Sequence, residues 1–186
     1  MKTIKNEKLI KRNSQIGQWT SLGALAVLGG GMYLSFSKPE LFSYSLIALV
    51  IGFMLTQVGM YFGNRFGRSP RPDEKLDAAL KGLPGDFTMY HYVTSVSHLL
   101  VGPAGIWVIL PMRQRGKVSY QKNRWKLTGG GFAQGYMSIF GQEGLGRPDL
   151  DIQNEVQAAT KFLDQKMDGA EVPEVHGILV FTHDEI

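Results

Sequence analysis

The chain of 186 residues contains no cysteine. That absence excludes disulfide bonds, thiolate-bound metal ions and cysteine nucleophiles, and it suits a domain in the cytoplasm. Charged residues are missing from two long stretches, residues 16–36 and 41–63. At about 1.5 Å per residue, each stretch is long enough as a helix to cross a hydrocarbon core of about 30 Å. We therefore predict two transmembrane helices, which form a membrane anchor over residues 1–68.

A cleaved signal peptide is the alternative interpretation of the first apolar stretch, because the basic sequence MKTIKNEKLIKR precedes it. The apolar run is longer than the roughly 7 to 15 residues usual for a signal peptide, and no small-x-small cleavage site follows it. A second span also begins four residues later. These features favour an uncleaved anchor.

Cations flank the outer ends of the two spans, whereas the connecting loop SKPE contains one lysine and one glutamate. Because flanks rich in Lys and Arg stay in the cytoplasm, we expect a two-span protein of the cytoplasmic (inner) membrane. Both termini and the domain that follows the spans are then cytoplasmic. The flanking cations are Lys2, Lys5, Lys8, Lys11 and Arg12 before the first span and Arg65, Arg68 and Arg71 after the second.

Small residues are frequent inside the spans, and they permit close approach of neighbouring helices. Two uses remain open: the glycines seat the two helices of the hairpin on each other, or they pack against another membrane protein. Neither span contains Asp, Glu, Lys, Arg or His, which argues against an ion pathway, a proton relay or a haem site. The glycines assigned to helix packing are Gly23, Gly29 and Gly30 in the first span and Gly52, Gly59 and Gly63 in the second.

The formal net charge of +4 belongs to the membrane flanks and not to the rest of the chain. From Ser69 onward the sequence has 12 Lys and Arg against 14 Asp and Glu, a balance of −2. A globally basic nucleic-acid-binding domain is therefore not indicated.

Hydrophobic periodicity and turn residues predict a mixed α/β domain over residues 69–186, in the order α-β-β-β-α-β. The second helix has the clearest pattern, with Asp149 or Asp151 as its N-cap. A glycine-rich stretch, residues 128–150, is long enough to suggest contact with a partner. The predicted ranges are 73–83 for the first helix, 86–93, 95–102 and 105–111 for three strands, 115–127 for an extra strand or a hairpin turning near Lys122, 149–169 for the second helix and 175–183 for the last strand.

Several pieces of this domain follow the order found in the nuclease-related domain (NERD) family, a branch of the restriction-endonuclease-like superfamily. They are the helix with Glu74 early and LKGLP late, the strand pair HLLVGPAGIWVI, Gly116 with Lys117, Trp125, the helix start RPDLDIQ and the strand GILVF. From about Asp73 onward the chain resembles this family, which implies a restriction-endonuclease-like fold. Such folds usually continue beyond the last strand, which leaves room for a further C-terminal piece.

The resemblance also identifies the positions of a metal site. In NERD proteins an Asp directly precedes the His of HLLVGP, and an acidic-x-Lys triplet ends the GIWVI strand; the acids hold a divalent ion that activates water. The matching residues here are Ser97, Leu110 and Met112, and no Asp or Glu occurs between Asp86 and Glu143. A hydroxyl, a Leu and a Met cannot hold Mg²⁺, so we expect a catalytically inactive pseudo-nuclease with no metal and no cofactor.

Other titratable residues have simpler interpretations. Asp73 and Glu74 start the first helix, and we interpret them as an N-cap and a first-turn acid. The histidines show no metal-ligand spacing, and we interpret them as ordinary strand or core residues. They are His91, His98, His176 and His183.

Basic residues alternate in two trios, one over residues 113–117 and one over residues 122–126, so strand geometry places each trio on one face, with Tyr120 and Trp125 on the other. Such a face suits nucleic acid, anionic lipid headgroups or an acidic protein, and a merely solvated face is the remaining interpretation. The residues are Arg113, Arg115, Lys117, Lys122, Arg124 and Lys126.

Three functions therefore compete. The first choice is a membrane-anchored, catalytically inactive NERD-like accessory or scaffold subunit of a larger membrane protein assembly. The second is a membrane-tethered nucleic-acid-binding module without cleavage activity. The third is an active metal-dependent nuclease that uses unorthodox residues.

Overall fold

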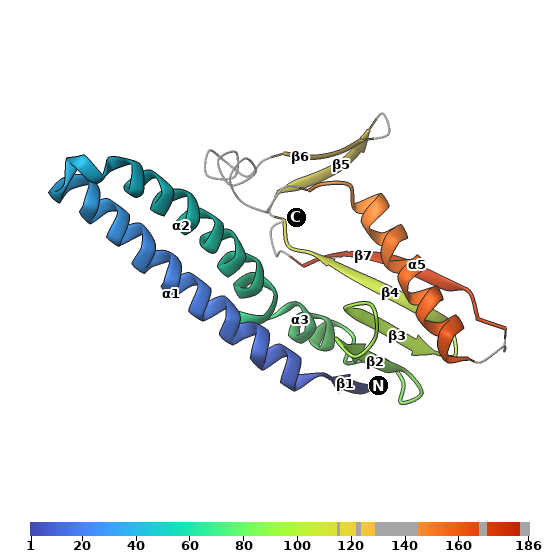
Figure 1. Ribbon diagram of the computed structural model, residues 1–186. Coiled ribbons are helices and arrows are strands. Elements are labelled where there is room, and N and C mark those ends of the chain that lie inside the picture. The colour runs from blue at the N-terminus through green and yellow to red at the C-terminus, as the bar shows by residue number, and fades with distance from the viewer. Residues whose placement is uncertain (115, 122–123, 129–144, 168–170, 183–186) are drawn as a thin grey trace. The chain divides into compact units, whose positions relative to one another are not determined.

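The computed structural model describes residues 1–114, 116–121, 124–128, 145–167 and 171–182 (Figure 1). The chain divides into two compact units. Glu7–Arg71 forms a helical unit, and Met1–Asn6 joins Pro72–Ile186 in an α/β unit. The anchor predicted from the sequence ends at residue 68 and includes the first six residues, which the structure groups with the α/β unit instead.

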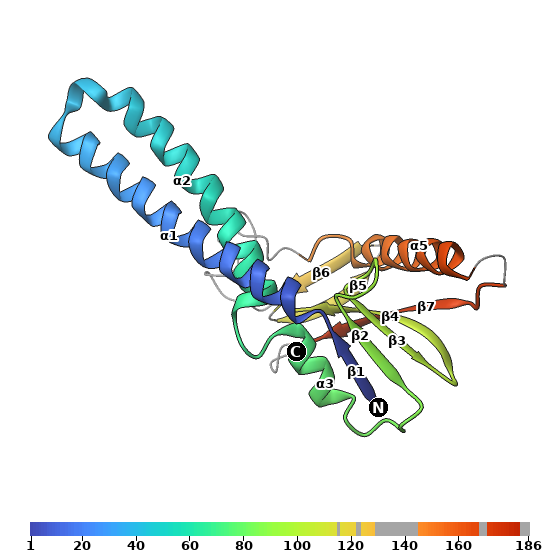
Figure 2. The same ribbon diagram turned by 60° about the horizontal axis from the view of Figure 1, so that its bottom comes forward.

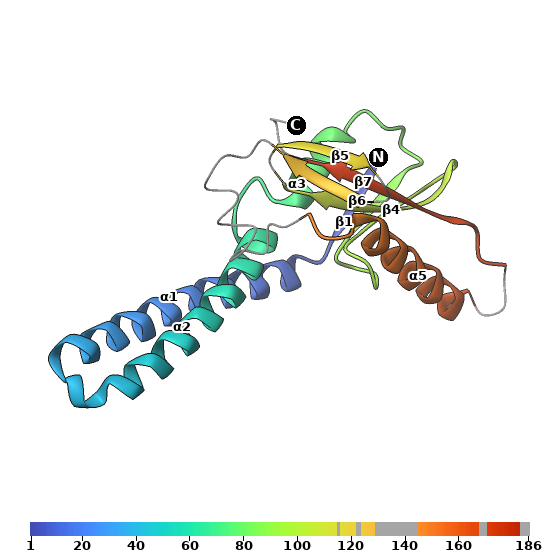
Figure 3. The ribbon, with the colours of Figure 1, turned by 90° about the horizontal axis from the view of Figure 1, so that it is seen from above.

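The helical unit is an antiparallel hairpin of α1 (Glu7–Ser37) and α2 (Phe42–Phe62), which run side by side (Figures 2 and 3). A 3₁₀ turn (Pro39–Leu41) joins them, and a π-helical turn, η2 (Gly63–Gly67), follows α2. Both helices are long and apolar enough to cross a membrane. Their large side chains point outward: Trp19, Leu25 and Phe36 are 73%, 70% and 78% exposed. An apolar surface of this kind suits contact with lipid.

The contact between the two helices repeats every seven residues. This spacing returns to the same side of a helix after two turns, so each helix presents one narrow seam of mostly small residues. A Cβ added to Gly31 would lie 2.9 Å from Cβ of Ala48, and one added to Gly52 would lie 2.6 Å from Leu28. The buried seam positions are Ile10, Gly17, Ala24 and Gly31 in α1, Ser45, Gly52 and Gly59 in α2, and Phe66 in η2.

We expect Gly52→Leu to weaken the hairpin, because the new side chain overlaps Leu28 and the backbone of α1. Overpacking of this kind costs about 1–3 kcal/mol. Thermal unfolding in detergent, followed by circular dichroism, measures the effect. Gly29→Leu is the matched control, since nothing lies within 4 Å of a Cβ at Gly29. Equal melting temperatures for the two variants would contradict this description of the seam.

The α/β unit contains a mixed five-stranded sheet in the order β1-β2-β3-β4-β7. The outer pairs β1–β2 and β4–β7 are parallel, and the inner pairs are antiparallel. A separate antiparallel hairpin, β5–β6, lies outside this sheet. The elements are β1 (Lys2–Lys5), α3 (Pro72–Ala79), β2 (Thr88–His91), β3 (His98–Gly102), β4 (Gly105–Met112), β5 (Lys117–Gln121), β6 (Arg124–Thr128), α5 (Pro148–Lys166) and β7 (Val175–Phe181).

Helices α3 and α5 cover opposite faces of the sheet (Figure 2). Strand residues alternate between the faces, so neighbouring apolar residues of β3 serve different cores. Leu99 packs with Ala159 on the α5 side, and Leu100 packs with Leu76 on the α3 side. Gly177 allows α5 to pack close to β7, because a Cβ at this position would lie 2.5 Å from the Ile152 side chain.

The predicted element order is confirmed in this mixed α/β unit, including the hairpin before the second helix, but two details differ. The α5 helix begins at Pro148 after Arg147, so neither Asp149 nor Asp151 is its N-cap; proline is favoured at a first helical position because it lacks an N–H. Likewise Asp73 is not an N-cap, since α3 begins at Pro72. The predicted turn at Lys122, the helix end at Gly169 and most of the glycine-rich stretch lie outside the described residues.

Candidate functional site

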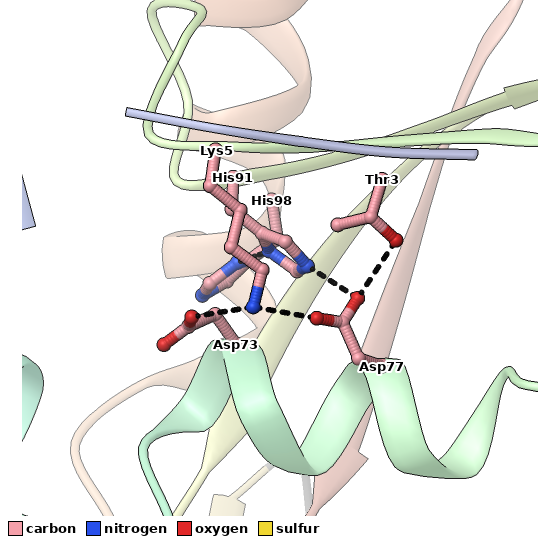
Figure 4. Close-up of polar contacts among 6 residues, drawn as sticks. All are labelled: Thr3, Lys5, Asp73, Asp77, His91 and His98. Carbon is pink, nitrogen blue, oxygen red and sulfur yellow. Dashed lines mark hydrogen bonds and ion pairs between the residues drawn. The ribbon is translucent and has the colours of Figure 1, made fainter. Parts of the chain in front are cut away.

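A group of polar side chains, three of them buried, lies where β1, α3, β2 and β3 meet (Figure 4). We call it the polar cluster; its members are Thr3, Lys5, Asp73, Asp77, His91 and His98. Asp73 and His91 are 0% exposed, and His98 is 2% exposed. Burial of so many ionisable groups is costly unless each finds a partner. The contacts within the cluster supply those partners.

Lys5 of β1 binds two carboxylates of α3. Its Nζ lies 3.1 Å from Oδ2 of Asp73 and 2.6 Å from Oδ2 of Asp77. The two acids are four residues apart, which places them on one face of the helix. Asp77 also accepts a hydrogen bond of 3.2 Å from the Thr3 hydroxyl, so two β1 side chains contact this carboxylate.

The two histidines face each other across the β2–β3 pair. His91 and His98 are register partners, their rings are 5.0 Å apart, and their Nδ1 atoms are 2.7 Å apart. Nε2 of His91 lies 3.0 Å from Oδ1 of Asp77. The turn that brings the strands together starts at Tyr92, whose φ of 57° is in the left-handed region. Its N–H donates to the carbonyl of Ser97 at 2.9 Å and closes the turn.

This geometry fixes the tautomers of the pair. An ionised carboxylate accepts hydrogen bonds only, so Nε2 of His91 carries a proton and donates it to Asp77. When His91 is neutral, its Nδ1 has no hydrogen, and it accepts a hydrogen bond from Nδ1–H of His98. The result is a continuous chain of hydrogen bonds from His98 through His91 and Asp77 to Lys5.

The pKa values follow from burial and from these contacts. Burial alone lowers the pKa of Lys5, but its hydrogen bonds to Asp77 and Asp73 outweigh that effect and raise the pKa above its usual value. Burial raises the pKa of Asp77, yet the hydrogen bonds from Lys5 and His91 leave it lowered. For His91 burial dominates: its pKa is lowered, although the hydrogen bond to Asp77 acts in the opposite direction. The cluster therefore combines an ionised Lys–Asp group with a neutral histidine at pH 7.

The polar cluster links chain segments that are far apart in the sequence. Its histidines and Asp73 are buried, whereas Lys5 and Asp77 are partly exposed. Within the described ranges, no group of three or more His, Cys, Asp and Glu side chains is arranged to hold a metal ion. The ion pairs of Lys5 join the residues that precede α1 to the helix that follows η2. The start of α1 and the end of α2 therefore lie on the same side of any membrane that the two helices cross.

The three positions singled out by the NERD resemblance lie elsewhere in the α/β unit. Ser97 directly precedes β3, and continuing the β3–β4 register by two residues places it opposite Leu110. Leu110 and Met112 lie two and four residues after Val108, which belongs to the α5-side core, so all three side chains lie on the same face of β4. The polar cluster lies on the other face of the sheet, because His91 is two residues after Met89, which belongs to the α3-side core. Neither Leu110 nor Met112 has an oxygen ligand to offer an ion.

The β5–β6 hairpin carries the predicted basic residues. Its register pairs Lys117 with Thr128, Ser119 with Lys126 and Gln121 with Arg124. Paired residues share a face of an antiparallel ladder, so all three cations lie on one face. Arg113 is exposed before the hairpin. Arg115 and Lys122 lie outside the described residues.

The predicted packing glycines fall into two sets. Gly52 and Gly59 belong to the seam of the helical hairpin, where a Cβ at Gly59 would meet Oγ of Ser21. A Cβ would meet nothing within 4 Å at Gly23, Gly29, Gly30 or Gly63. The backbone nitrogen of Gly63 nevertheless lies 3.0 Å from a Cβ built on Gly17, a seam residue that sequence reasoning did not select.

Sequence reasoning also missed the polar cluster. Lys5 was assigned to the basic flank of the first span, and Asp77 was assigned no role. His91 and His98 were treated as separate strand residues, although a turn midway between them makes them register partners. The recoverable signals were the four-residue spacing of Asp73 and Asp77 and the equal distance of the two histidines from the β2–β3 turn.

In comparisons with known proteins, no family model, no curated protein and no solved structure matches this chain.

Proposed function

We propose that this protein is a membrane-anchored, catalytically inactive NERD-like accessory or scaffold subunit of a larger membrane protein assembly. The observation that carries the proposal is the second set of glycines in α1. A glycine facing lipid gains no packing and lowers helix stability by about 1 kcal/mol relative to alanine. In membrane helices small residues favour close approach of another helix. The seam with α2 accounts for Gly17 and Gly31 but not for the outward-facing glycines.

These outward-facing residues form a stripe along α1. At 100° per residue, Gly23, Ala26 and Gly30 point away from the seam that contains Gly17 and Gly31. Ala26 and Gly30 are exposed, and Trp19 and Tyr33, 67% exposed, lie one turn beyond the stripe at either end. The shallow stripe between two large aromatic side chains suits a helix of a partner membrane protein.

The proposal that the protein is catalytically inactive rests on the three positions that the NERD resemblance assigns to a metal site. Ser97, Leu110 and Met112 offer a hydroxyl and two apolar side chains where the resemblance implies two acids and a lysine. The order α3-β2-β3-β4, then a hairpin, then α5-β7 supports the restriction-endonuclease-like interpretation of the fold. A fold of this kind without metal ligands is suited to binding, and the two long apolar helices support a role at a membrane.

Mild detergent extraction of the tagged protein from its native membrane, followed by mass spectrometry, tests the proposal. We expect other integral membrane proteins to co-purify in fixed ratio with the native chain, and Gly23→Leu/Gly30→Leu to reduce their recovery at least ten-fold, about 1.4 kcal/mol. Val50→Leu, at an exposed position of α2, is the matched control and should retain the partners. Recovery of the native chain alone would overturn the proposal. If that chain carried nucleic acid released by salt, the nucleic-acid-binding alternative would replace it.

A further inference from the structure

The β5–β6 hairpin has two chemically different faces. One face, the basic face, presents Lys117, Arg124 and Lys126 together with Ser119, Gln121 and Thr128. All except Ser119 are exposed. The other face presents Val118, Tyr120, Trp125 and Leu127, and the rings of Tyr120 and Trp125 lie 5.1 Å apart. The apolar face gives the hairpin a packing side, and the basic face is left for contact outside the domain.

Among the described residues, the acid nearest to the basic face in the fold is Asp149, which lines a pocket with Arg124 but forms its ion pair with Arg147. The sequence contains no Asp or Glu from residue 87 to residue 142. Within the described part of the chain, none of the three lysines and arginines of the face forms an ion pair. Residues two apart on a strand are separated by about 7 Å, so Arg124 and Lys126 form a short row with Lys117 diagonally across the ladder. The face is small, flat and cationic.

We infer that the basic face binds the anionic lipid headgroups of the bilayer that α1 and α2 cross. Three cations at about 1 kcal/mol each give only weak binding to an anionic surface from solution. This chain, however, carries its own membrane spans, and the connections between the units are short: Asn6 joins β1 to α1, and residues 68–71 join η2 to α3. Tethering of this kind presents headgroups at a high effective concentration, so a three-charge face is sufficient.

Nucleic acid is less well matched to the same face. Binding from solution is lost steeply with salt, and useful affinity at physiological ionic strength requires contacts to more phosphates than three cations provide. The exposed aromatic of the hairpin, Tyr120, lies on the opposite face, so bases have no stacking partner beside the cations. Binding of a membrane-tethered face to lipid phosphates requires neither many phosphate contacts nor a stacking partner.

The absence of cysteine permits a direct test with a single spin label. A nitroxide on Gln121→Cys reports from the basic face, and one on Gln157→Cys reports from an exposed position of α5. The full chain is placed in nanodiscs of phosphatidylcholine alone or with about 30% phosphatidylglycerol. Collision with a lipid-anchored nickel chelate then measures the distance of each label from the headgroups. We expect strong relaxation at residue 121 in the anionic discs only, reversed in about 0.5 M NaCl, and no lipid dependence at residue 157.

Charge removal makes the test specific. Each single change among Lys117→Gln, Arg124→Gln and Lys126→Gln should weaken docking about five-fold, and the triple variant should abolish the lipid dependence. Equal relaxation at residue 121 in both lipid compositions would overturn the inference. Protection of the label by an added single-stranded oligonucleotide, without any response to anionic lipid, would also overturn it and assign the face to nucleic acid. Neither result bears on partner capture by α1, so the two proposals fail separately.

Discussion

Lys5→Met should lower the free energy of unfolding of the α/β unit by about 3 kcal/mol, equivalent to roughly 10 °C in melting temperature. The substitution keeps the length and the apolar stem of the side chain, but it removes the cation between Asp73 and Asp77. Asp73 is fully buried, and a carboxylate left there without its ammonium partner is strongly destabilising. Thermal unfolding of the detergent-solubilised chain at neutral pH measures the change.

Two further variants separate the loss of charge from damage to β1. Lys2→Met, on the same strand but exposed, should leave the melting temperature within about 2 °C of the native value. Adding Asp73→Asn to Lys5→Met should recover part of the lost stability, because the second change removes the buried carboxylate charge that has lost the ammonium group of Lys5. A double variant that is less stable than Lys5→Met alone would contradict the electrostatic explanation.

Acid should destabilise the α/β unit, starting near pH 6.5. Because the pKa of His91 is lowered in the folded protein, the unfolded chain takes up the proton first as the pH falls below 6.5. Stability is then lost until the pH reaches the folded pKa, at no more than about 1.4 kcal/mol per pH unit for one proton. The pKa of Asp77 is also lowered, so a second loss follows below about pH 3.8. The titratable groups that face His91 are His98, Asp77, Asp73 and Lys5.

Melting temperatures from pH 8 to pH 5 test this prediction. His91→Gln retains an amide N–H for Asp77 but cannot titrate, so it should lower stability at pH 8 and flatten the decline below pH 6.5. His176→Gln, on β7 beside Trp107, is the control and should keep the slope of the native protein. Parallel curves for the native chain and His91→Gln would refute a role for this histidine in acid sensitivity.

Local pattern was sufficient to predict the two long helices and the order of elements after residue 72. Apolar runs, strand-like alternation and glycine or proline breaks act over a few residues, and they do not depend on distant contacts. Strand alternation also predicts that Arg124 and Lys126 share a face, but the register of the β5–β6 hairpin is needed to put Lys117 on that same face. The restriction-endonuclease-like interpretation and the loss of the metal site remain predictions.

Features that depend on distant residues were not predictable. The strand KTIK has one apolar residue, and its lysines match the basic flank of a membrane span equally well, so nothing local reveals that it pairs with residues 88–91. Glycine content likewise shows that helices approach closely, but not which side of each helix is used. The side of α1 that faces α2 is the one with Gly17, Ala24 and Gly31 at seven-residue spacing. Several other small residues in α1 have similar spacings, so only the packing against α2 identifies this set.

The pairing of β1 with β2 makes formation of the helical hairpin a step in the folding of the α/β unit. Lys2 pairs with Thr88, and the intervening residues 7–71 are the helical hairpin. Closing an unstructured loop of that length costs about 4 kcal/mol of chain entropy. A formed hairpin removes most of that cost, because its antiparallel helices bring their own ends together. A chain whose hairpin fails to form is therefore left with an open sheet edge on β2, and Asp73 and Asp77 lack the ammonium group of Lys5. Such a chain exposes that edge to chaperones and proteases.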